Sequence, residues 1–368
     1  MIRELFTKRG TIIVFAALVL ATGWFISVIL AIGIAVAGNV LMTYIISGPA
    51  YKGAVTDHFN GKKFTNPTGV KAKGFREVLK WMMNRDRGKW ETPGNFQYGE
   101  APVERVTNGL RITFVNHSTF LIQSDGVNIL TDPVWSDRVS PFTWAGPKRI
   151  RPAGIRFEDL PPIDIILLSH NHYDHLDMPT MQLVFEKFQP KIFTALGVSA
   201  LLRQYGIKNV VDMDWWQEVT LSGSLQLVAV PAQHFSGRGT FDRDATLWCG
   251  FVIARKEGNI YFAGDTGYND VTFKEIGSRF DPISIAIVPI GAYKPRWFMS
   301  PIHTAPREAV QIHLDLRAHK SIACHFGTFT LADEGQEELF RDLETALKGL
   351  NVPAPDFLVL KEGVPITF

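Results

Sequence analysis

Side chains that could bind a divalent metal ion gather in one short stretch of the chain. Residues 169–177, SHNHYDHLD, contain three histidines and two aspartates, although the 368-residue chain has only 10 histidines. Imidazole nitrogen and carboxylate oxygen are ligands that suit zinc and similar ions. The stretch follows IDIILL, a predicted strand, and the turn at a strand end can direct several side chains toward one point. A polar surface loop is the alternative interpretation.

Three further candidate ligands lie at the ends of other predicted strands. His234 follows LQLVAVPAQ, Asp265 lies in NIYFAGDTGY, and His325 closes SIACHF. Taken singly, a histidine at such a position is more often a hydrogen-bonded structural residue. Together with the first stretch, these residues could hold two ions that share a water molecule. In that arrangement Asp265 bridges the ions, which are bound by His170, His172 and His234 and by Asp174, His175 and His325.

The elements that must position these residues follow from the apolar pattern. Short apolar runs separated by turn residues predict strands, and longer amphipathic stretches predict helices. The predicted strands are 111–116, 119–123, 127–130, 163–168, 191–196, 225–232, 247–253, 259–263, 285–290, 321–325 and 357–360. The predicted helices are 75–83, 178–188, 198–205, 271–280, 306–316 and 335–350. Two mainly β sheets with helices outside them are the architecture that this order favours.

The N-terminal region is expected to act as a membrane anchor. Residues 11–50 contain no Asp, Glu, Lys or Arg, and a spanning helix needs only about 20 such residues. A signal peptide cleaved near Ala35–Ala37 is the alternative, but the apolar run continues past that point. Basic residues at Arg3, Lys8 and Arg9 favour a cytoplasmic N-terminus, which in a bacterial inner membrane puts a catalytic domain on the periplasmic side. A hairpin folded at Gly33–Gly38 would instead return the domain to the cytoplasm.

Length and charge limit the other possibilities. The chain divides into an anchor over residues 1–50, a polar connector over 51–105 that packs on the core, and a catalytic domain over 106–368. With 38 basic and 36 acidic residues the formal net charge is +2, which excludes the strong single-sign field of a nucleic-acid-binding protein. Cys249 and Cys324 are interpreted as buried apolar residues. The pattern leaves homodimerisation open.

These candidate ligands resemble those of a known superfamily, the metallo-β-lactamase-fold hydrolases. The histidine-rich run, the later histidine, the GDTGY aspartate and the final histidine match its metal-binding motifs in order. Over roughly residues 106–368 the chain is most similar to N-acylphosphatidylethanolamine-hydrolysing phospholipase D and its bacterial, RomA-type relatives. The resemblance implies an αββα sandwich with two Zn²⁺ ions, Mn²⁺ being the other candidate. It rests on the blocks NILTDPVWSDRVSPFTWAGPKRIRP, LPPIDIILLSHNHYDHLD, PAQHF, YFAGDTGY, FKEIGSRF, PIGAYKPRWFM and HFGTFTLADE.

The resemblance also assigns roles to two residues outside the ligand set. Asp132, in LTDP, matches an aspartate beneath the metals, where a carboxylate can fix the outer N–H of a ligand or the attacking water. A turn-forming role is the alternative. His303, in SPIH, matches a histidine that borders the substrate phosphate and could donate a hydrogen bond or a proton. The residues around His303 differ from those of the animal enzyme, so the resemblance does not fix the head group. Asp174 is expected to take part in catalysis as well as in metal binding.

Basic and aromatic residues complete the candidate substrate site. Lys148 and Arg149 could pair with a lipid phosphate, although a solvated loop explains them equally well. Tyr293, in GAYKPRWFM, is expected to contact substrate. His117 is expected to support a ligand or pack beside the site. The remaining histidines fit no ligand spacing and are expected at the surface: His58, His313 and His319.

These observations favour a metal-dependent phosphodiesterase that acts on (N-acyl)phosphatidylethanolamine-like membrane lipids. The second interpretation is a hydrolase of the same fold that cleaves a lactone or another ester instead of a phosphodiester. A third is a non-catalytic envelope factor that uses metal for folding. Hydrolysis of β-lactams is less favoured because those enzymes generally lack a pair like Asp174 and His175, and a nuclease is disfavoured by the near-neutral charge.

Overall fold

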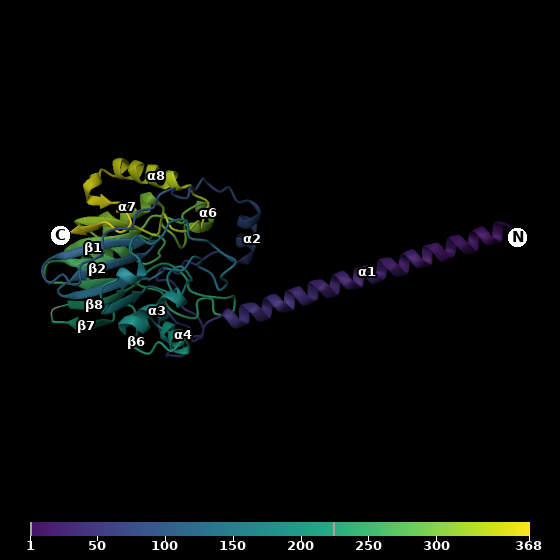
Figure 1. Cartoon of the computed structure of the whole chain (residues 1–368), viewed down its shortest axis with the longest axis horizontal. Helices are drawn as coiled ribbons and strands as arrows, with labels where there is room; N and C mark the ends of the chain where they lie inside the picture. Colours follow the sequence, from purple (N-terminus) through teal and green to yellow (C-terminus); the bar gives the residue numbers. More distant parts are fainter. Residues whose placement is uncertain (1, 224) are drawn as a thin grey trace. The chain divides into compact units, whose positions relative to one another are not determined.

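The computed structural model describes residues 2–223 and 225–368, which form two compact units (Figure 1). One unit contains the N-terminal residues up to Ser47 together with Gly239–Phe241. The other contains Gly48–Arg238 and Asp242–Phe368 and carries every candidate metal ligand.

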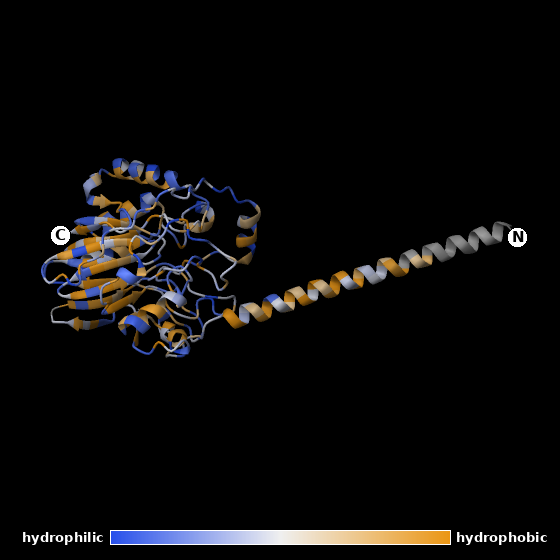
Figure 2. Cartoon of the chain, in the orientation of Figure 1, coloured by the Kyte–Doolittle hydropathy of each residue, from blue (hydrophilic) through white to orange (hydrophobic). Residues whose placement is uncertain are grey.

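Helix α1 (Ile2–Ile46) makes up nearly all of the first unit. Its segment Val19–Ile46 is 28 residues long and apolar enough to cross a membrane. Figure 2 shows this segment in orange and white with little blue. The helix runs without interruption through Gly33–Gly38, so the alternative of a hairpin at these glycines is wrong.

The first sheet of the second unit has the strand order β14-β1-β2-β3-β4-β5-β6. Strands β3 to β6 pair in parallel, whereas β14, β1, β2 and β3 pair antiparallel. The strands are β1 (Leu110–Asn116), β2 (Thr119–Ser124), β3 (Val127–Thr131), β4 (Ile165–Leu168), β5 (Lys191–Ala195), β6 (Val210–Met213) and β14 (Pro365–Thr367).

The second sheet has the order β13-β12-β11-β10-β9-β8-β7. Its strands β10 to β13 are parallel, and β7, β8, β9 and β10 pair antiparallel. The strands are β7 (Glu218–Ser222), β8 (Leu225–Val230), β9 (Gly250–Ala254), β10 (Asn259–Phe262), β11 (Ile283–Pro289), β12 (Lys320–Cys324) and β13 (Phe357–Leu358). Three strands, β6, β7 and β14, were not expected from the sequence.

Helices cover the outer faces of both sheets, which gives the four-layer α+β sandwich expected from the sequence. Apolar residues of α3 (Met178–Phe188) and α4 (Val198–Gln204) pack on the first sheet. Helices α5 (Thr272–Arg279), α7 (Pro306–Asp315) and α8 (Gln336–Gly349) pack on the second. Two further helices, α2 (Phe75–Met83) and α6 (Arg296–Met299), lie next to each other away from the sheets.

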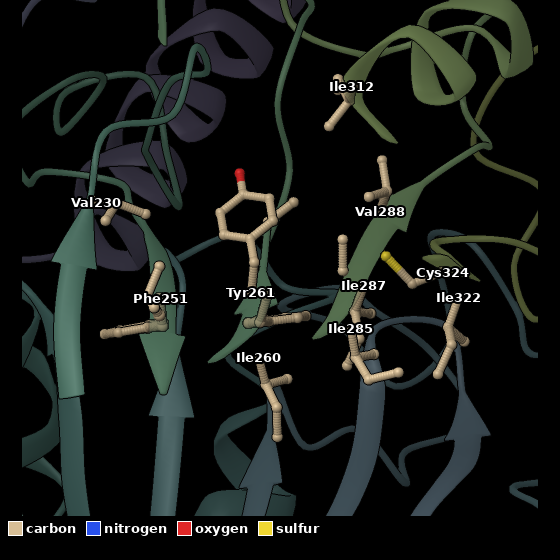
Figure 3. Packing of buried hydrophobic residues seen from close by; sticks show 14 of the residues in the cluster. Val230, Phe251, Ile260, Tyr261, Ile285, Ile287, Val288, Ile312, Ile322 and Cys324 are labelled. Atoms are coloured by element: carbon tan, nitrogen blue, oxygen red, sulfur yellow. The ribbon is translucent and has the colours of Figure 1, made fainter. Parts of the chain in front are cut away.

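The main core lies between the sheets and under the helices of the second sheet. Phe114 and Phe120 from the first sheet and Phe251 and Phe262 from the second are all fully buried in it. Figure 3 shows the second sheet from close by, where Val288 of β11 points toward Ile312 of α7. Such burial of apolar area stabilises the domain by about 25 cal/mol per Å².

Truncation of this core should destabilise the protein strongly. We expect Phe251→Ala to lower the free energy of unfolding by about 3–5 kcal/mol, because the cavity left between the sheets adds to the lost transfer energy. Denaturant unfolding of the detergent-solubilised chain measures this change. Leu183→Ala, at a side chain that is 50% exposed on α3, is the matched control and should change stability by less than about 1 kcal/mol. Equal losses in both variants would contradict this description of the core.

Candidate metal centre

All candidate ligands lie at one edge of the sandwich, where strands of both sheets end. The metal-binding loop follows β4, which is parallel to β3. In the second sheet β8, β10 and β12 also point the same way, because β9 is antiparallel to both β8 and β10 and β11 is parallel to both β10 and β12. The carboxyl ends of these strands are followed by His234, Asp265 and His325. The strand directions therefore bring four distant segments to one place.

One group of ligands consists of three histidine rings. Nδ1 of His172 lies 2.8 Å from Nε2 of His170 and 3.3 Å from Nε2 of His234. Nδ1 of His234 lies 2.9 Å from the Ile302 carbonyl oxygen, which accepts a hydrogen bond from the Nδ1–H, so Nε2 keeps its lone pair. The three nitrogens lie close enough together to hold one metal ion.

The second group contains Asp174, His175 and His325. Oδ2 of Asp174 lies 3.5 Å from Nε2 of His175 and 3.4 Å from Nε2 of His325. Nε2 of His117 lies 3.0 Å from the same carboxylate oxygen, and the His117 and His325 ring centroids are 4.1 Å apart. His117 thus lies where it can fix the Asp174 carboxylate, as the sequence led us to expect.

Asp265 lies between the two groups. Its Oδ2 is 3.1 Å from Nε2 of His325, 3.3 Å from Nε2 of His175 and 3.7 Å from Nε2 of His234. The side chain is 2% exposed. A carboxylate in this position could contact two ions, and this role stays a prediction.

Asp132 lies behind the ligands and does not line the cavity beside them. Its Oδ2 accepts a hydrogen bond from Nδ1 of His175 at 2.7 Å and from the Ser169 hydroxyl at 2.6 Å. The Ser169 hydroxyl oxygen is then free to accept from Nδ1 of His170, 2.9 Å away. One buried carboxylate therefore sets the tautomer of a histidine in each group so that Nε2 faces the site.

The residues present fit a divalent metal. Buried atoms that have no hydrogen-bond partner among the described residues point into the group: Nε2 of His175, Nε2 of His325 and Oδ1 of Asp265. Buried polar groups are normally satisfied, so these atoms indicate a cation as the missing partner. The set of imidazole nitrogens and carboxylate oxygens suits zinc, and it contains no thiolate. The role of these residues as ligands stays a prediction.

The pKa values separate the histidines into two kinds. Burial lowers the pKa of His170 well below its ordinary value, of His172 to about 4 and of His234 to about 3. Burial also acts to lower the pKa of His325, but the carboxylates of Asp265 and Asp174 outweigh it and raise the pKa to about 9. In the same way Asp265, Asp174 and Asp132 outweigh burial and raise the pKa of His175 well above its ordinary value.

A cavity of about 290 Å³ opens beside the ligands. His303 lines it, with a side chain that is 12% exposed and a buried Nδ1 that has no partner among the described residues, 3.8 Å from Oδ2 of Asp265. Burial lowers the pKa of His303 to about 3, so its ring is neutral near pH 7. The other lining residues combine metal ligands, basic side chains and apolar side chains: Ala72, Lys73, Val78, Trp81, His172, Asp174, Phe235, Arg243, Asp265, Phe298, Met299, Ile302 and Leu331.

Three predicted substrate-binding residues are not brought to this cavity. The guanidinium of Arg149 donates to the carbonyls of Ser136 and Val134 and lies over the Phe329 ring, while Lys148 is exposed. Tyr293 is buried, and its hydroxyl donates to Asp342. The cationic residues that do line the cavity are Lys73 and Arg243, which the sequence alone did not single out.

Sequence reasoning also missed a residue that positions His234. The side chain of Asn66 accepts a hydrogen bond from the His234 backbone N–H at 2.8 Å and donates to its carbonyl at 2.9 Å. The Trp248 indole N–H donates to the same asparagine. The only signal was the turn sequence TNPTG in the connector. The connector therefore helps to build the site.

One histidine expected at the surface is buried. His313 lies on α7 with Nδ1 2.9 Å from the Ser321 hydroxyl, so that prediction was wrong, because a neighbouring strand covers the ring. His58 is partly buried, with a side chain that is 13% exposed, and it stacks on Trp215 between Asp57 and Asp214. His319 is exposed as expected, and Cys249 and Cys324 are buried free thiols.

Comparison with known proteins agrees with this fold. Residues 127–326 match the model of the Beta-lactamase superfamily domain. The N-acyl-phosphatidylethanolamine-hydrolyzing phospholipase D 1 of Caenorhabditis elegans is 36% identical over 314 residues, which cover 79% of this chain and 87% of the relative. A UPF0173 metal-dependent hydrolase of Methanopyrus kandleri is 29% identical over 257 residues, covering 69% and 98%. The structure of a possible metal-dependent hydrolase from Veillonella parvula superposes with a TM-score of 0.57 at 18% identity, covering 71% of this chain and 100% of that chain.

Together the fold and the site define a metal-dependent hydrolase with the metallo-β-lactamase fold. The chain belongs to the beta-lactamase superfamily. The resemblance to N-acylphosphatidylethanolamine-hydrolysing phospholipase D that the sequence suggested is confirmed.

Loss of the Asn66 side chain should weaken metal binding at the three-histidine group. We expect Asn66→Ala to lower the affinity for one zinc ion by about 10- to 100-fold, the usual effect of removing an outer partner of a metal ligand. Competition with a chromophoric chelator measures this. Asn60→Ala is the matched control, since Asn60 caps only the local backbone of Lys62 and Lys63. Equal affinities in the two variants would contradict the role given to Asn66.

Metal binding should release protons near pH 7. In the metal-free protein the pKa of His325 is raised to about 9 and that of His175 well above its ordinary value, so both rings are protonated near pH 7, and a protonated nitrogen cannot bind metal. The apparent affinity should therefore rise as pH increases toward 9. Calorimetric titration with zinc in buffers of different ionisation enthalpy measures the released protons. An affinity independent of pH between 6 and 8 would contradict this prediction.

Proposed function

We propose that the protein is a zinc-dependent phosphodiester hydrolase of the phospholipase D type that acts on (N-acyl)phosphatidylethanolamine-like membrane lipids. The observation that carries the proposal is the composition of the cavity. Candidate metal-site residues line it together with apolar residues that include Val78, Trp81 and Phe298. A lipid has the same two parts, a charged phosphodiester and an apolar acyl region. The phospholipase D relative supports this assignment.

The chain's own residues would bind and orient the phosphodiester. Lys73 and Arg243 bring positive charge to the cavity wall, which suits a phosphate anion. Because the ring of His303 is neutral, it would orient the substrate by a hydrogen bond from its N–H and would not act as a charged acid. Asp132 would act only through the histidines that it orients.

Two divalent ions at this site would lower the pKa of a water molecule and neutralise phosphoryl oxygens. One would be held by His170, His172 and His234, and the other by Asp174, His175 and His325, with Asp265 contacting both. In the reaction, water oxygen bonds to phosphorus, the bond from phosphorus to the head-group oxygen breaks, and that oxygen takes up a proton. Zinc fits the histidine-rich donor set best, and manganese is the second candidate.

We also propose that the chain is anchored in a membrane. Helix α1 would anchor the chain in a bacterial inner membrane, and the basic residues Arg3, Lys8 and Arg9 favour a cytoplasmic N-terminus. Because α1 is one continuous helix, the catalytic unit would then be periplasmic. The partner that this arrangement requires is a membrane phospholipid, and nucleic acid is not proposed as a ligand. A lactone or other ester is the alternative substrate for the same metal centre.

Turnover of a lipid panel tests the proposed function. We expect the purified chain to release phosphatidate from N-acylphosphatidylethanolamine or phosphatidylethanolamine and to lose activity when a chelator removes the metal. His303→Gln should lower kcat/KM by about 10- to 100-fold without changing the metal content, because a hydrogen bond to a charged group contributes about 1.5–3 kcal/mol. His319→Gln, at an exposed histidine away from the cavity, is the control. Hydrolysis of a lactone with no turnover of any phospholipid would contradict the lipid assignment.

A further inference from the structure

The outer face of α2 is apolar and faces solvent. Phe75, Leu79, Met82 and Met83 are 79%, 45%, 62% and 71% exposed. Their spacing of four, three and one residues puts them on one stripe of the helix. Four large apolar side chains side by side are costly in water unless a partner covers them, whereas single exposed apolar residues are common.

The opposite face of α2 forms part of the cavity wall beside the metal centre. Val78 and Trp81 line the cavity, and the Trp81 ring stacks on Phe298 at 4.9 Å. The Trp81 indole N–H donates to Asp333 at 2.7 Å, and Arg85 pairs with the same carboxylate. These contacts hold α2 in a fixed orientation, with one face toward the cavity and the other toward solvent.

Basic residues accompany the apolar stripe, in the sequence around α2 and on the helix itself. Residues 71–89, KAKGFREVLKWMMNRDRGK, contain seven basic and two acidic residues, a net charge of +5 in a chain whose formal net charge is +2. Arg76 and Lys80 are exposed on α2 itself. Nζ of Lys80 lies 5.0 Å from the ring centroid of Trp297, which is 43% exposed and extends the apolar surface onto α6. An amphipathic helix with this combination of charge and apolar side chains is typical of binding in the plane of a membrane interface.

We propose that the apolar stripe of α2, together with Trp297, docks onto the surface of an anionic phospholipid bilayer and presents the adjoining cavity to the lipid. The stripe would enter the acyl boundary while the basic residues pair with anionic head groups. This contact is separate from any membrane crossing by α1. Delivery of lipid to the cavity rests on the proposed function, whereas docking itself can be measured without any turnover.

Depth measurements on a spin-labelled chain test the proposal. Because Cys249 and Cys324 are buried, a nitroxide reagent would label only an introduced cysteine. The full chain carrying Met82→Cys is reconstituted into vesicles of phosphatidylcholine and phosphatidylglycerol in equal parts. We expect the label to become more accessible to oxygen than to a water-soluble nickel chelate. Leu183→Cys on α3, also at an exposed apolar position, is the matched control and should show the opposite accessibility.

Charge removal provides the second arm. Each basic residue near an anionic surface contributes about 1 kcal/mol, or about fivefold in binding. Arg76→Gln together with Lys80→Gln should therefore lower the equilibrium constant for docking by roughly 25-fold. Vesicles of phosphatidylcholine alone, which carry no net charge, should weaken docking of the unchanged chain to a similar extent.

Two results would overturn the proposal. One is equal accessibility to the nickel chelate at positions 82 and 183 in anionic vesicles. The other is spin–spin broadening between labels of two copies at position 82, which would assign the face to a protein dimer. Docking without turnover of any phospholipid would contradict the proposed substrate and leave the docking face established.

Discussion

The site depends on the burial of three carboxylates among histidine rings at the junction of two sheets. Asp132, Asp174 and Asp265 come from different segments, and their side chains are 0%, 15% and 2% exposed. Burial makes a negative charge costly unless a cation or a hydrogen-bond donor compensates for it. Asp132 is compensated by protein donors, whereas Asp265 keeps a buried oxygen without a partner among the described residues. A pair of divalent cations would supply that compensation and also the chemistry of a hydrolase.

The backbone is strained where three of the strands end beside the site. His117, Asp132 and His325 have positive φ angles of 47°, 33° and 59°, a region that residues other than glycine seldom adopt. Each of them follows directly on β1, β3 or β12. The chain therefore turns sharply where these strands end, and the close packing of the sheets holds the three residues in that conformation.

Much of the fold and of the ligand set could be predicted from the sequence. The apolar runs gave the buried strands, because strands such as β4 and β11 are covered by other layers. Strand β7 alternates exposed and half-buried residues at a sheet edge, and β6 and β14 are short, so their apolar signal was weak. The candidate ligands lie shortly after such strands, so the same apolar runs indicated where they come together.

Residues whose role depends on side-chain direction could not be predicted. Arg149 and Tyr293 lie in sequence blocks that resemble a lipid hydrolase, but the Arg149 side chain holds a loop together and the Tyr293 hydroxyl binds α8. Asn66 reaches the site from the connector, and Arg243 reaches it from a loop that carries no recognisable motif. Their positions follow from tertiary packing, which a single sequence does not encode locally.

The central claim is that the two ligand groups hold two metal ions that share Asp265. The most direct measurement is anomalous diffraction at the zinc absorption edge from crystals of the zinc-loaded protein. The account predicts two peaks, one bound by His170, His172 and His234, the other by Asp174, His175 and His325, and both in contact with Asp265. Absence of zinc from this edge of the sandwich, or peaks that His234, Asp265 and His325 do not contact, would contradict it.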